Sequence, residues 1–343
     1  MKRLLIITIF IVISVIASLM VFFRYPSHFA LYSWLDNVQI EEIKKKEKVQ
    51  MYKKEYWDDY KCYKSAEGVR VYTYIFHYII PDKYIDPNNK VEYWNSLSPE
   101  FFEKILRLLF KKRDEKKIEI VSLYDLEDFS KKDCFPSKNI VILTSDDWWD
   151  DNYNYLFPLA KKYNIPFNLA IISWKVSKTS SQINNFANEQ EIKEMLDSWF
   201  VTVASHTINH FDLTKISKKN KESEICDSKR DLENAFWIKI NTLVYPSGKY
   251  DEDTIRFAKS CGYSYGFASL NKSIFSEDLK NKPFELTRLR VNRKSEIENI
   301  FSFWDNISVT QKPDDNKIQE PPKQQPWVIE PTAKHQPQQK NKK

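Results

Sequence analysis

The chain has 343 residues, of which 42% are hydrophobic and 15% aromatic, so it can hold one large domain with appendages or two small ones. Its formal net charge is only +6, and part of that charge lies near the C-terminus, so no dense basic patch suggests nucleic acid as a partner. Glycine is scarce, with four residues in all, and a glycine inside a motif is therefore informative.

The N-terminus begins with an uncharged segment, Leu4–Phe23, which follows Lys2 and Arg3. At about 1.5 Å per residue, a helix of this length spans the roughly 30 Å hydrocarbon core of a bilayer. We therefore predict a transmembrane anchor over residues 1–24; the alternative is a cleaved signal peptide, but no small-x-small cleavage site follows. The positive-inside rule then makes this a single-pass protein of the cell membrane with its body outside the cytoplasm, or a secreted one if the anchor is cleaved.

Two further segments lack the pattern of a folded domain. Residues 25–67 are rich in Lys, Glu and Tyr and are predicted to form a charged helical stalk. Its lysines could lie on a membrane surface, although a solvated helix face is the commoner explanation. Residues 306–343 are rich in Pro, Gln and Lys and are predicted to be a disordered tail.

Strand and helix patterns alternate between these segments. Ser98 and Pro99 are typical of a helix start, as cap and first residue, and apolar residues recur on one face of the helix that follows. The predicted strands are Val69–Phe76, Ile118–Ser122, Ile140–Thr144, Phe167–Ile172, Val201–Ala204, Thr242–Tyr245 and Tyr263–Ala268. The helices predicted between the later strands are Tyr153–Tyr163, Glu189–Trp199, Glu222–Trp237 and Asp251–Cys261. This order favours an α/β fold with a parallel sheet, open or closed, and the number of strands over about 230 residues favours a barrel.

The four cysteines are Cys62, Cys134, Cys226 and Cys261, and none forms a Cys-x-x-Cys metal motif. Outside the cell they could pair in three ways, and free, buried thiols are an equal alternative for Cys226 and Cys261.

Two carboxylates, Asp146 and Asp147, directly follow the apolar strand Ile140–Thr144. We expect them at the carboxyl end of the sheet, where α/β folds keep their chemistry. His206 and His210 follow another strand, and two histidines four residues apart can turn their ring nitrogens toward one metal ion. Asp147 as third ligand would complete a two-histidine, one-carboxylate site for a divalent metal. An isolated pair of surface or capping histidines is the alternative.

Three motifs in this order resemble the metal-dependent polysaccharide deacetylases. They are Thr144-Ser145-Asp146-Asp147, Ser205-His206-Thr207-x-x-His210 and Tyr245-Pro246-Ser247-Gly248-x-Tyr250-Asp251. The resemblance covers roughly residues 69–291 and implies a deacetylase domain over residues 68–305, folded as a distorted (β/α) barrel of about seven strands. It also implies that Asp146 is the general base and that Asp147, His206 and His210 bind the metal, usually zinc.

The segment Ile75-Phe76-His77-Tyr78-Ile79 is similar to the poly-N-acetylglucosamine deacetylase branch of this family, in which the motif order is permuted. The resemblance implies that His77 is the general acid; a packed histidine at a strand end is the alternative. The predicted strand Leu286–Val291 resembles the last motif of that branch. There Arg288 could orient Asp146, or be an ordinary solvated arginine.

Two further features bear on the substrate. The backbone N–H of Ser247, in the turn between Pro246 and Gly248, could face an oxyanion, although Pro-Ser-Gly is also simply a good turn. Trp148 and Trp149 could stack on a sugar at the mouth of the site or fill the core of a rearranged loop. Ser145, Trp148, Val244 and Ser247 depart from the usual Phe, Gly, Arg and Tyr of the family motifs, while the metal and acid–base side chains remain.

Together these features predict a membrane-anchored, metal-dependent hydrolase that removes N-acetyl groups from an extracellular or cell-wall polymer of N-acetylhexosamine. The polymer could be a poly-N-acetylglucosamine of biofilms, a chitin-like glycan or peptidoglycan. Two alternatives remain, a glycan-binding protein that has lost catalysis and a metal hydrolase of the same fold that cleaves another C–N bond.

Overall fold

The computed structural model describes residues 69–132, 134–136, 138–147, 149–176, 186–198, 200–295 and 297–300. Within these ranges, no helix combines the length and the apolar character needed to cross a membrane. The predicted anchor (1–24), stalk (25–67) and tail (306–343) lie outside the described residues, and so does Trp148.

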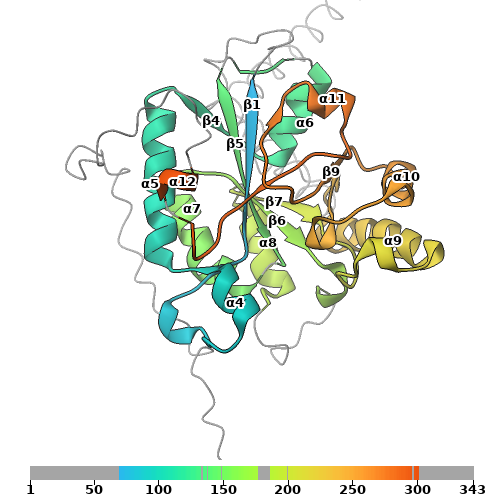
Figure 1. The fold of residues 1–343 in the computed structure, drawn as a ribbon, viewed down its shortest axis with the longest axis horizontal. Coiled ribbons are helices and arrows are strands. Elements are labelled where there is room, and N and C mark those ends of the chain that lie inside the picture. Colours follow the sequence, from blue (N-terminus) through green and yellow to red (C-terminus); the bar gives the residue numbers. More distant parts are fainter. Residues whose placement is uncertain are drawn as a thin grey trace, which may run out of the picture. The chain divides into compact units, whose positions relative to one another are not determined.

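The centre of the fold is a curled, mostly parallel sheet with helices packed around it (Figure 1). Its strands run in the order β10–β1–β5–β6–β7–β8–β9, with β4 paired to β5 and β11 paired to β1. Only the pairing of β10 with β1 is antiparallel within this sheet as described. The bounds are β1 (Arg70–Phe76), β4 (Ile118–Ile120), β5 (Asn139–Asp146), β6 (Phe167–Ile171), β7 (Val201–Ser205), β8 (Thr242–Val244), β9 (Tyr265–Phe267), β10 (Ile274–Phe275) and β11 (Leu289–Arg290). A separate pair, β2 (Tyr78–Ile79) and β3 (Ser96–Leu97), follows β1 in the chain.

Strand β5 is buried on both faces of the sheet. Ile140 to Leu143 alternate between the two faces, and all four are fully buried. The helices that return the chain between the parallel strands pack around the outside of the curled sheet, and the curl encloses the inner face (Figure 1). The predicted α/β fold is confirmed.

The two edges of the curled sheet are linked by one segment. Leu286 pairs with Phe267 of β9, and Leu289 pairs with Tyr74 of β1. The sheet is thus a distorted half-barrel, and residues 286–289 cross from one edge to the other. This crossing brings Arg288 over the carboxyl end of β5, as described below.

The predicted helices are present to within a few residues of their expected bounds, whereas α4, α6, α11 and α12 were not predicted. Ser98 caps α5 by accepting a hydrogen bond from the Phe101 N–H at 3.2 Å, and Pro99 is its first residue. The buried face of α5 consists of Phe102, Ile105, Leu106 and Leu109, whereas Phe101 and Leu108 are only partly covered. The bounds are α4 (Lys90–Asn95), α5 (Pro99–Asp114), α6 (Leu123–Lys132), α7 (Phe157–Tyr163), α8 (Glu189–Asp197), α9 (Lys218–Phe236), α10 (Glu252–Ser260), α11 (Asp278–Asn281) and α12 (Ile297–Ile300). Short helical turns are η1 (Asp82–Tyr84), η2 (Asn152–Leu156, a π-helical turn), η3 (Ser173–Lys175), η4 (Leu213–Lys215) and η5 (Pro246–Gly248).

A disulfide joins Cys226 in α9 to Cys261 at the end of α10, with their Cα atoms 5.3 Å apart. Cys134 is also disulfide-bonded, and no free thiol occurs among the described residues. The question left open by the sequence is therefore answered in favour of pairing for Cys226 and Cys261. Cys62 lies outside the described residues.

Candidate metal centre and acid–base site

The two neighbouring carboxylates leave the end of β5 in different directions. Asp146 is the last residue of the strand and pairs with Ala170 of β6, whereas Asp147 turns out of the ladder with φ +72°. This left-handed conformation is uncommon for a residue with a side chain, although Asp and Asn tolerate it better than most. Both carboxylates therefore lie at the carboxyl end of the sheet, as predicted, and both lie within 4 Å of His206 Nε2. Only Asp146 binds Arg288, however, and only Asp147 contacts His210.

His206 directly follows β7 and is fully buried. Its Nδ1 lies 2.8 Å from the Val244 carbonyl oxygen of β8, and because a carbonyl only accepts, Nδ1 carries the proton. Burial lowers the pKa of His206 to about 4, against the opposing charge of Asp146, so the ring is neutral at pH 7. Its Nε2 is thus left with a free lone pair, as a metal ligand requires.

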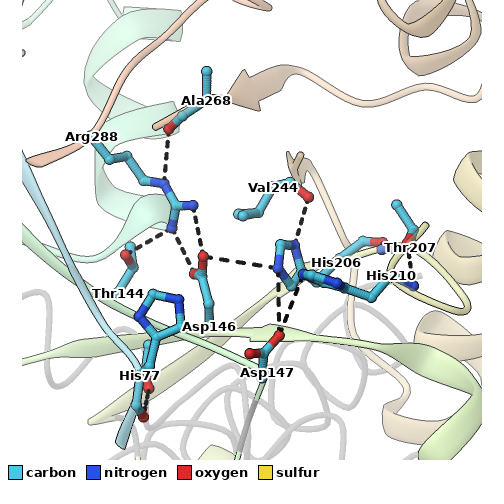
Figure 2. A network of polar contacts seen from close by, with 12 residues as sticks. His77, Thr144, Asp146, Asp147, His206, Thr207, His210, Val244, Ala268 and Arg288 are labelled. Atoms are coloured by element: carbon cyan, nitrogen blue, oxygen red, sulfur yellow. Dashed lines mark hydrogen bonds and ion pairs between the residues drawn. The ribbon is translucent and has the colours of Figure 1, made fainter. Parts of the chain in front are cut away.

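Three donor atoms face one another across a small gap (Figure 2). The Asp147 Oδ1 atom lies 3.7 Å from Nε2 of His206 and 3.6 Å from Nε2 of His210. Two ligands about 2.0–2.2 Å from one ion at tetrahedral angles stand about 3.3–3.6 Å apart, so these spacings suit a shared metal. Within the described structure, Asp147 Oδ1 is buried without a hydrogen-bond partner, which a cation would supply. The donor set fits a divalent metal.

Arg288 is 1% exposed and binds Asp146 through both of its terminal nitrogens (Figure 2). The Nη1–Oδ1 and Nη2–Oδ2 distances are 2.7 and 2.9 Å, and Nη1 also donates to Thr144 Oγ1 at 3.0 Å. Nε donates to the Ala268 carbonyl at 3.2 Å. Burial alone would raise the pKa of Asp146, but the charge and hydrogen bonds of Arg288 outweigh it and hold that pKa well below its usual range. Arg288 is therefore not an ordinary solvated arginine.

His77 follows β1, the strand that pairs with β5, and this pairing places it near Asp146 (Figure 2). Ser145 Oγ donates to the His77 carbonyl at 3.3 Å and helps to fix the backbone there. Among the described residues the buried Nδ1 of His77 has no hydrogen-bond partner. Burial lowers its pKa to about 4, while the charge of Asp146 acts in the opposite direction. His77 is therefore a neutral imidazole at pH 7 in the protein without ligands.

The turn that carries Ser247 follows β8, whose Val244 carbonyl holds His206, so the turn lies at the same edge of the sheet. Ser247 is exposed and adopts φ +56°. Gly248 has φ +71°, and a Cβ at this position would lie 2.6 Å from the backbone nitrogen of Ser269. The motif therefore needs glycine for both its conformation and its close approach.

Trp149 has both ring faces covered. Its ring stacks on Tyr78 with a centroid distance of 4.5 Å and on Phe186 with a distance of 4.4 Å. The Lys175 ammonium lies 3.4 Å from the Phe186 centroid and 5.6 Å from that of Trp149. Of the two interpretations of Trp149, the geometry favours packing, since neither face is open to a sugar.

Two acidic residues that support the site were not predicted. Glu224 of α9 accepts hydrogen bonds from the loop between the two histidines. Asp151 accepts a 2.6 Å hydrogen bond from the Ile79 N–H, two residues after His77. No sequence motif marks either residue, because each is a single acid whose hydrogen-bond donors are backbone N–H groups distant in the sequence. Only their burial identifies them.

Comparison with known proteins places these features in context. Residues 135–266 match the model of the family described as "Polysaccharide deacetylase". The chain is 31% identical over 135 residues to YxkH of Bacillus subtilis strain 168, a protein provisionally named a polysaccharide deacetylase. It is 25% identical over 223 residues to the poly-beta-1,6-N-acetyl-D-glucosamine N-deacetylase of Staphylococcus aureus strain MSSA476. These matches cover 39% and 62% of the chain, and they span 46% of YxkH and 73% of the S. aureus protein.

Among solved structures, the deacetylase PplD of Streptococcus pyogenes, in complex with acetate, has a similar fold. It superimposes with a TM-score of 0.59 at 23% sequence identity, over 68% of this chain and 97% of PplD. At this identity the likeness concerns the fold, and it agrees with the curled α/β sheet described above.

Proposed function

The chain belongs to the polysaccharide deacetylase family, and from this premise we propose that it is a metal-dependent N-deacetylase of an extracellular polymer of N-acetylhexosamine. The observation that carries the proposal is that a fixed carboxylate and a set of metal donors lie side by side at one edge of the sheet. A buried carboxylate, Asp146, is fixed by Arg288, and three metal donors, from Asp147, His206 and His210, converge beside it. Hydrolysis of an unreactive amide needs both a base and a centre of positive charge.

Zinc is the metal we assign to Asp147, His206 and His210. Two imidazole nitrogens and one carboxylate oxygen are a common zinc donor set in hydrolases that keep a position open for substrate. When bound, a divalent cation would supply Lewis acidity, polarising the acetyl carbonyl and acidifying a water molecule.

Asp146 accepts the proton of the attacking water. Its low pKa keeps it ionised, and the two hydrogen bonds from Arg288 fix the plane of the carboxylate before the substrate arrives. A base contributes only if its oxygen is already within reach of the proton it takes, so this fixation is as important as its charge.

His77 gives a proton to the departing nitrogen. Burial lowers the pKa of His77 to about 4, although the charge of Asp146 opposes this, so the ring starts neutral and must take up a proton before it can give one. The proton that the attacking water loses can supply it. The unpartnered Nδ1 leaves a ring nitrogen available for a substrate or a proton. The Ser247 N–H is our candidate donor to the oxyanion, and Trp148 our candidate for contact with the sugar.

A relative suggests the substrate class, and the N-terminal segment suggests the location of the protein. The S. aureus relative acts, by its name, on poly-β-1,6-N-acetylglucosamine, and we propose a polymer of this class. The uncharged segment Leu4–Phe23 would anchor the chain in the membrane, with residues 68–305 outside. The Cys226–Cys261 disulfide suits this oxidising side.

The test is an acetate-release assay on β-1,6-linked N-acetylglucosamine oligomers, chitin oligomers and peptidoglycan. Chelation should abolish release and zinc should restore it. Asp147→Ala and His206→Ala should lose both metal and activity, whereas Asp146→Asn should keep the metal and lose about 10²–10⁴-fold in rate. Binding of the polymer without acetate release, with any added divalent metal, would favour the non-catalytic glycan-binding alternative.

A further inference from the structure

One face of helix α9 is buried and yet polar. Lys221, Glu224 and Ser228 are three and four residues apart, so they lie on one side of the helix, and all three are buried. The buried face of a helix is normally apolar, because a buried polar group is costly unless it has a partner. The polarity of this face therefore calls for partners, and each of the three side chains has one near the candidate site.

The outer two side chains bind the elements on either side of the histidine loop. The Lys221 ammonium donates to both carboxylate oxygens of Asp251, at 2.7 and 2.5 Å, and Asp251 caps α10 just after the Ser247 turn. The hydroxyl oxygen of Ser228 lies 2.8 Å from that of Ser205, the last residue of β7. In this way α9 is fixed to the strand that ends at His206 and to the helix that follows the turn.

Glu224, between them, binds the loop itself. Its Oε2 accepts hydrogen bonds from the N–H groups of Ile208 at 3.0 Å and Asn209 at 2.8 Å, and its Oε1 accepts one from Asn209 Nδ2 at 2.6 Å. The side chain is buried, with the residue 4% exposed. Both N–H groups belong to the three residues that separate His206 from His210.

This loop needs external support. Thr207 and His210 both have positive φ, at 67° and 61°, a region that residues with side chains rarely occupy. Inside the loop, the His210 N–H donates to Thr207 Oγ1 at 3.1 Å. Glu224 supplies three more hydrogen bonds from outside, and they hold the middle of the loop between the two ligands.

We propose that Glu224 is a positioning residue that sets the spacing of His206 and His210 and thereby the affinity of the site for a divalent metal. Removal of residues that orient metal ligands typically costs about 10–100-fold in affinity. The inference rests on the proposed function only for metal binding by Asp147, His206 and His210, and it does not depend on deacetylation.

The test compares variants of the full chain by metal titration after chelator treatment. Zn²⁺ affinity is measured by competition with a chromophoric chelator, and the absorption spectrum of bound Co²⁺ reports the ligand geometry. Glu224→Gln keeps the length and an oxygen that accepts both backbone N–H groups, although its amide nitrogen cannot accept from Asn209 Nδ2, so it should weaken binding by less than about tenfold. Glu224→Asp keeps the charge but is too short to reach the loop, and it should weaken binding about 10–100-fold and change the Co²⁺ spectrum.

Glu222→Ala is the matched control, since Glu222 is exposed on the same helix. It should leave the affinity and the spectrum unchanged. Equal Zn²⁺ affinity of Glu224→Asp and the wild type would overturn the proposal, as would a stronger loss in Glu224→Gln than in Glu224→Asp, because charge rather than shape would then govern binding. Metal binding that depends on Glu224 in a protein without acetate release would leave this inference standing and contradict only the proposed function.

Discussion

Asp146 and Asp147 differ in what surrounds them, although they are adjacent in the chain. Asp146 has its charge balanced by the guanidinium of Arg288, whereas Asp147 directs an unpartnered oxygen at two imidazole nitrogens. The positive φ of Asp147 separates the two side chains. A carboxylate that is already neutralised is a poor metal ligand, so this arrangement fits the proposed roles, in which Asp147 binds the cation and Asp146 transfers the proton.

The first prediction concerns Arg288→Lys. Lysine keeps the positive charge but lacks the planar fork that binds both oxygens of Asp146. We expect kcat for acetate release to fall at least about tenfold, but by no more than the 10²–10⁴-fold typical of a general base. Zn²⁺ affinity should stay within a fewfold of the wild type. Unchanged kcat would mean that the bidentate geometry is irrelevant, and loss of metal would mean that Arg288 supports a different part of the site.

The second prediction uses two glycines with positive φ, Gly248 and Gly262. A Cβ on Gly248 would lie 2.6 Å from Ser269 N, whereas a Cβ on Gly262 would meet nothing within 4 Å. Gly262→Ala should therefore lower the free energy of unfolding by about 1 kcal/mol, from its conformation alone. Gly248→Ala adds the clash and should cost about 1–3 kcal/mol more, in urea unfolding experiments. Equal losses would show that the turn can move away from Ser269.

At the scale of elements, β2 is held in place by one buried acid. β2 has two residues and follows His77 directly, and its Ile79 N–H donates to Asp151 Oδ2. Asp151 belongs to the segment after β5, so it ties β2, which directly follows His77, to the segment that follows Asp147. Burial, with a contribution from the charge of Asp150, raises the pKa of Asp151 well above its usual value.

A third prediction follows for Asp151→Asn. The folded protein binds a proton on Asp151 more tightly than the unfolded chain, whose Asp has a pKa of about 3.9. Wild-type stability should therefore fall as the pH rises from about 4 through the raised pKa, because ionisation is then costly only in the folded state. In the variant, the asparagine oxygen can still accept the hydrogen bond from the Ile79 N–H, but the side chain does not ionise. In urea unfolding with a chelator present, the free energy of unfolding of the variant should rise relative to that of the wild type as the pH increases from 4 to 8. A difference in free energy of unfolding that does not change with pH would contradict the raised pKa.

Elements with a local pattern were predictable, and those defined by distant partners were not. β5 was evident from four consecutive aliphatic residues, and α5 from Ser98 and Pro99. The predicted strand Leu286–Val291 is shorter in the structure, where only Leu289 and Arg290 form β11. The segment leaves β9 at Leu286 and meets β1 at Leu289, so it follows neither neighbour for long.

At the scale of the whole molecule, the curl of the sheet assembles the site from distant parts of the sequence. Arg288 lies on the segment that crosses between the edges, and it reaches an aspartate 142 positions earlier in the chain. The pairs Asp146–Asp147 and His206–His210 could be proposed as site residues from the sequence, because the members of each pair are close in the chain and each pair follows a predicted strand. Glu224 and the pairing of Cys226 with Cys261 could not, because they depend on how α9 packs against the histidine loop and α10.

The last prediction concerns metal removal and the stability of this assembly. The three donors come from the loops after β5 and β7, so only the folded chain presents them together. A ligand that binds only the folded state raises the free energy of unfolding by about 2.7 kcal/mol at 100 times its Kd. Zinc at that concentration should therefore stabilise the chelator-treated wild type by about this amount in urea unfolding. His206→Ala should show no such gain at the same zinc concentration, whereas an equal gain would place the stabilising metal elsewhere.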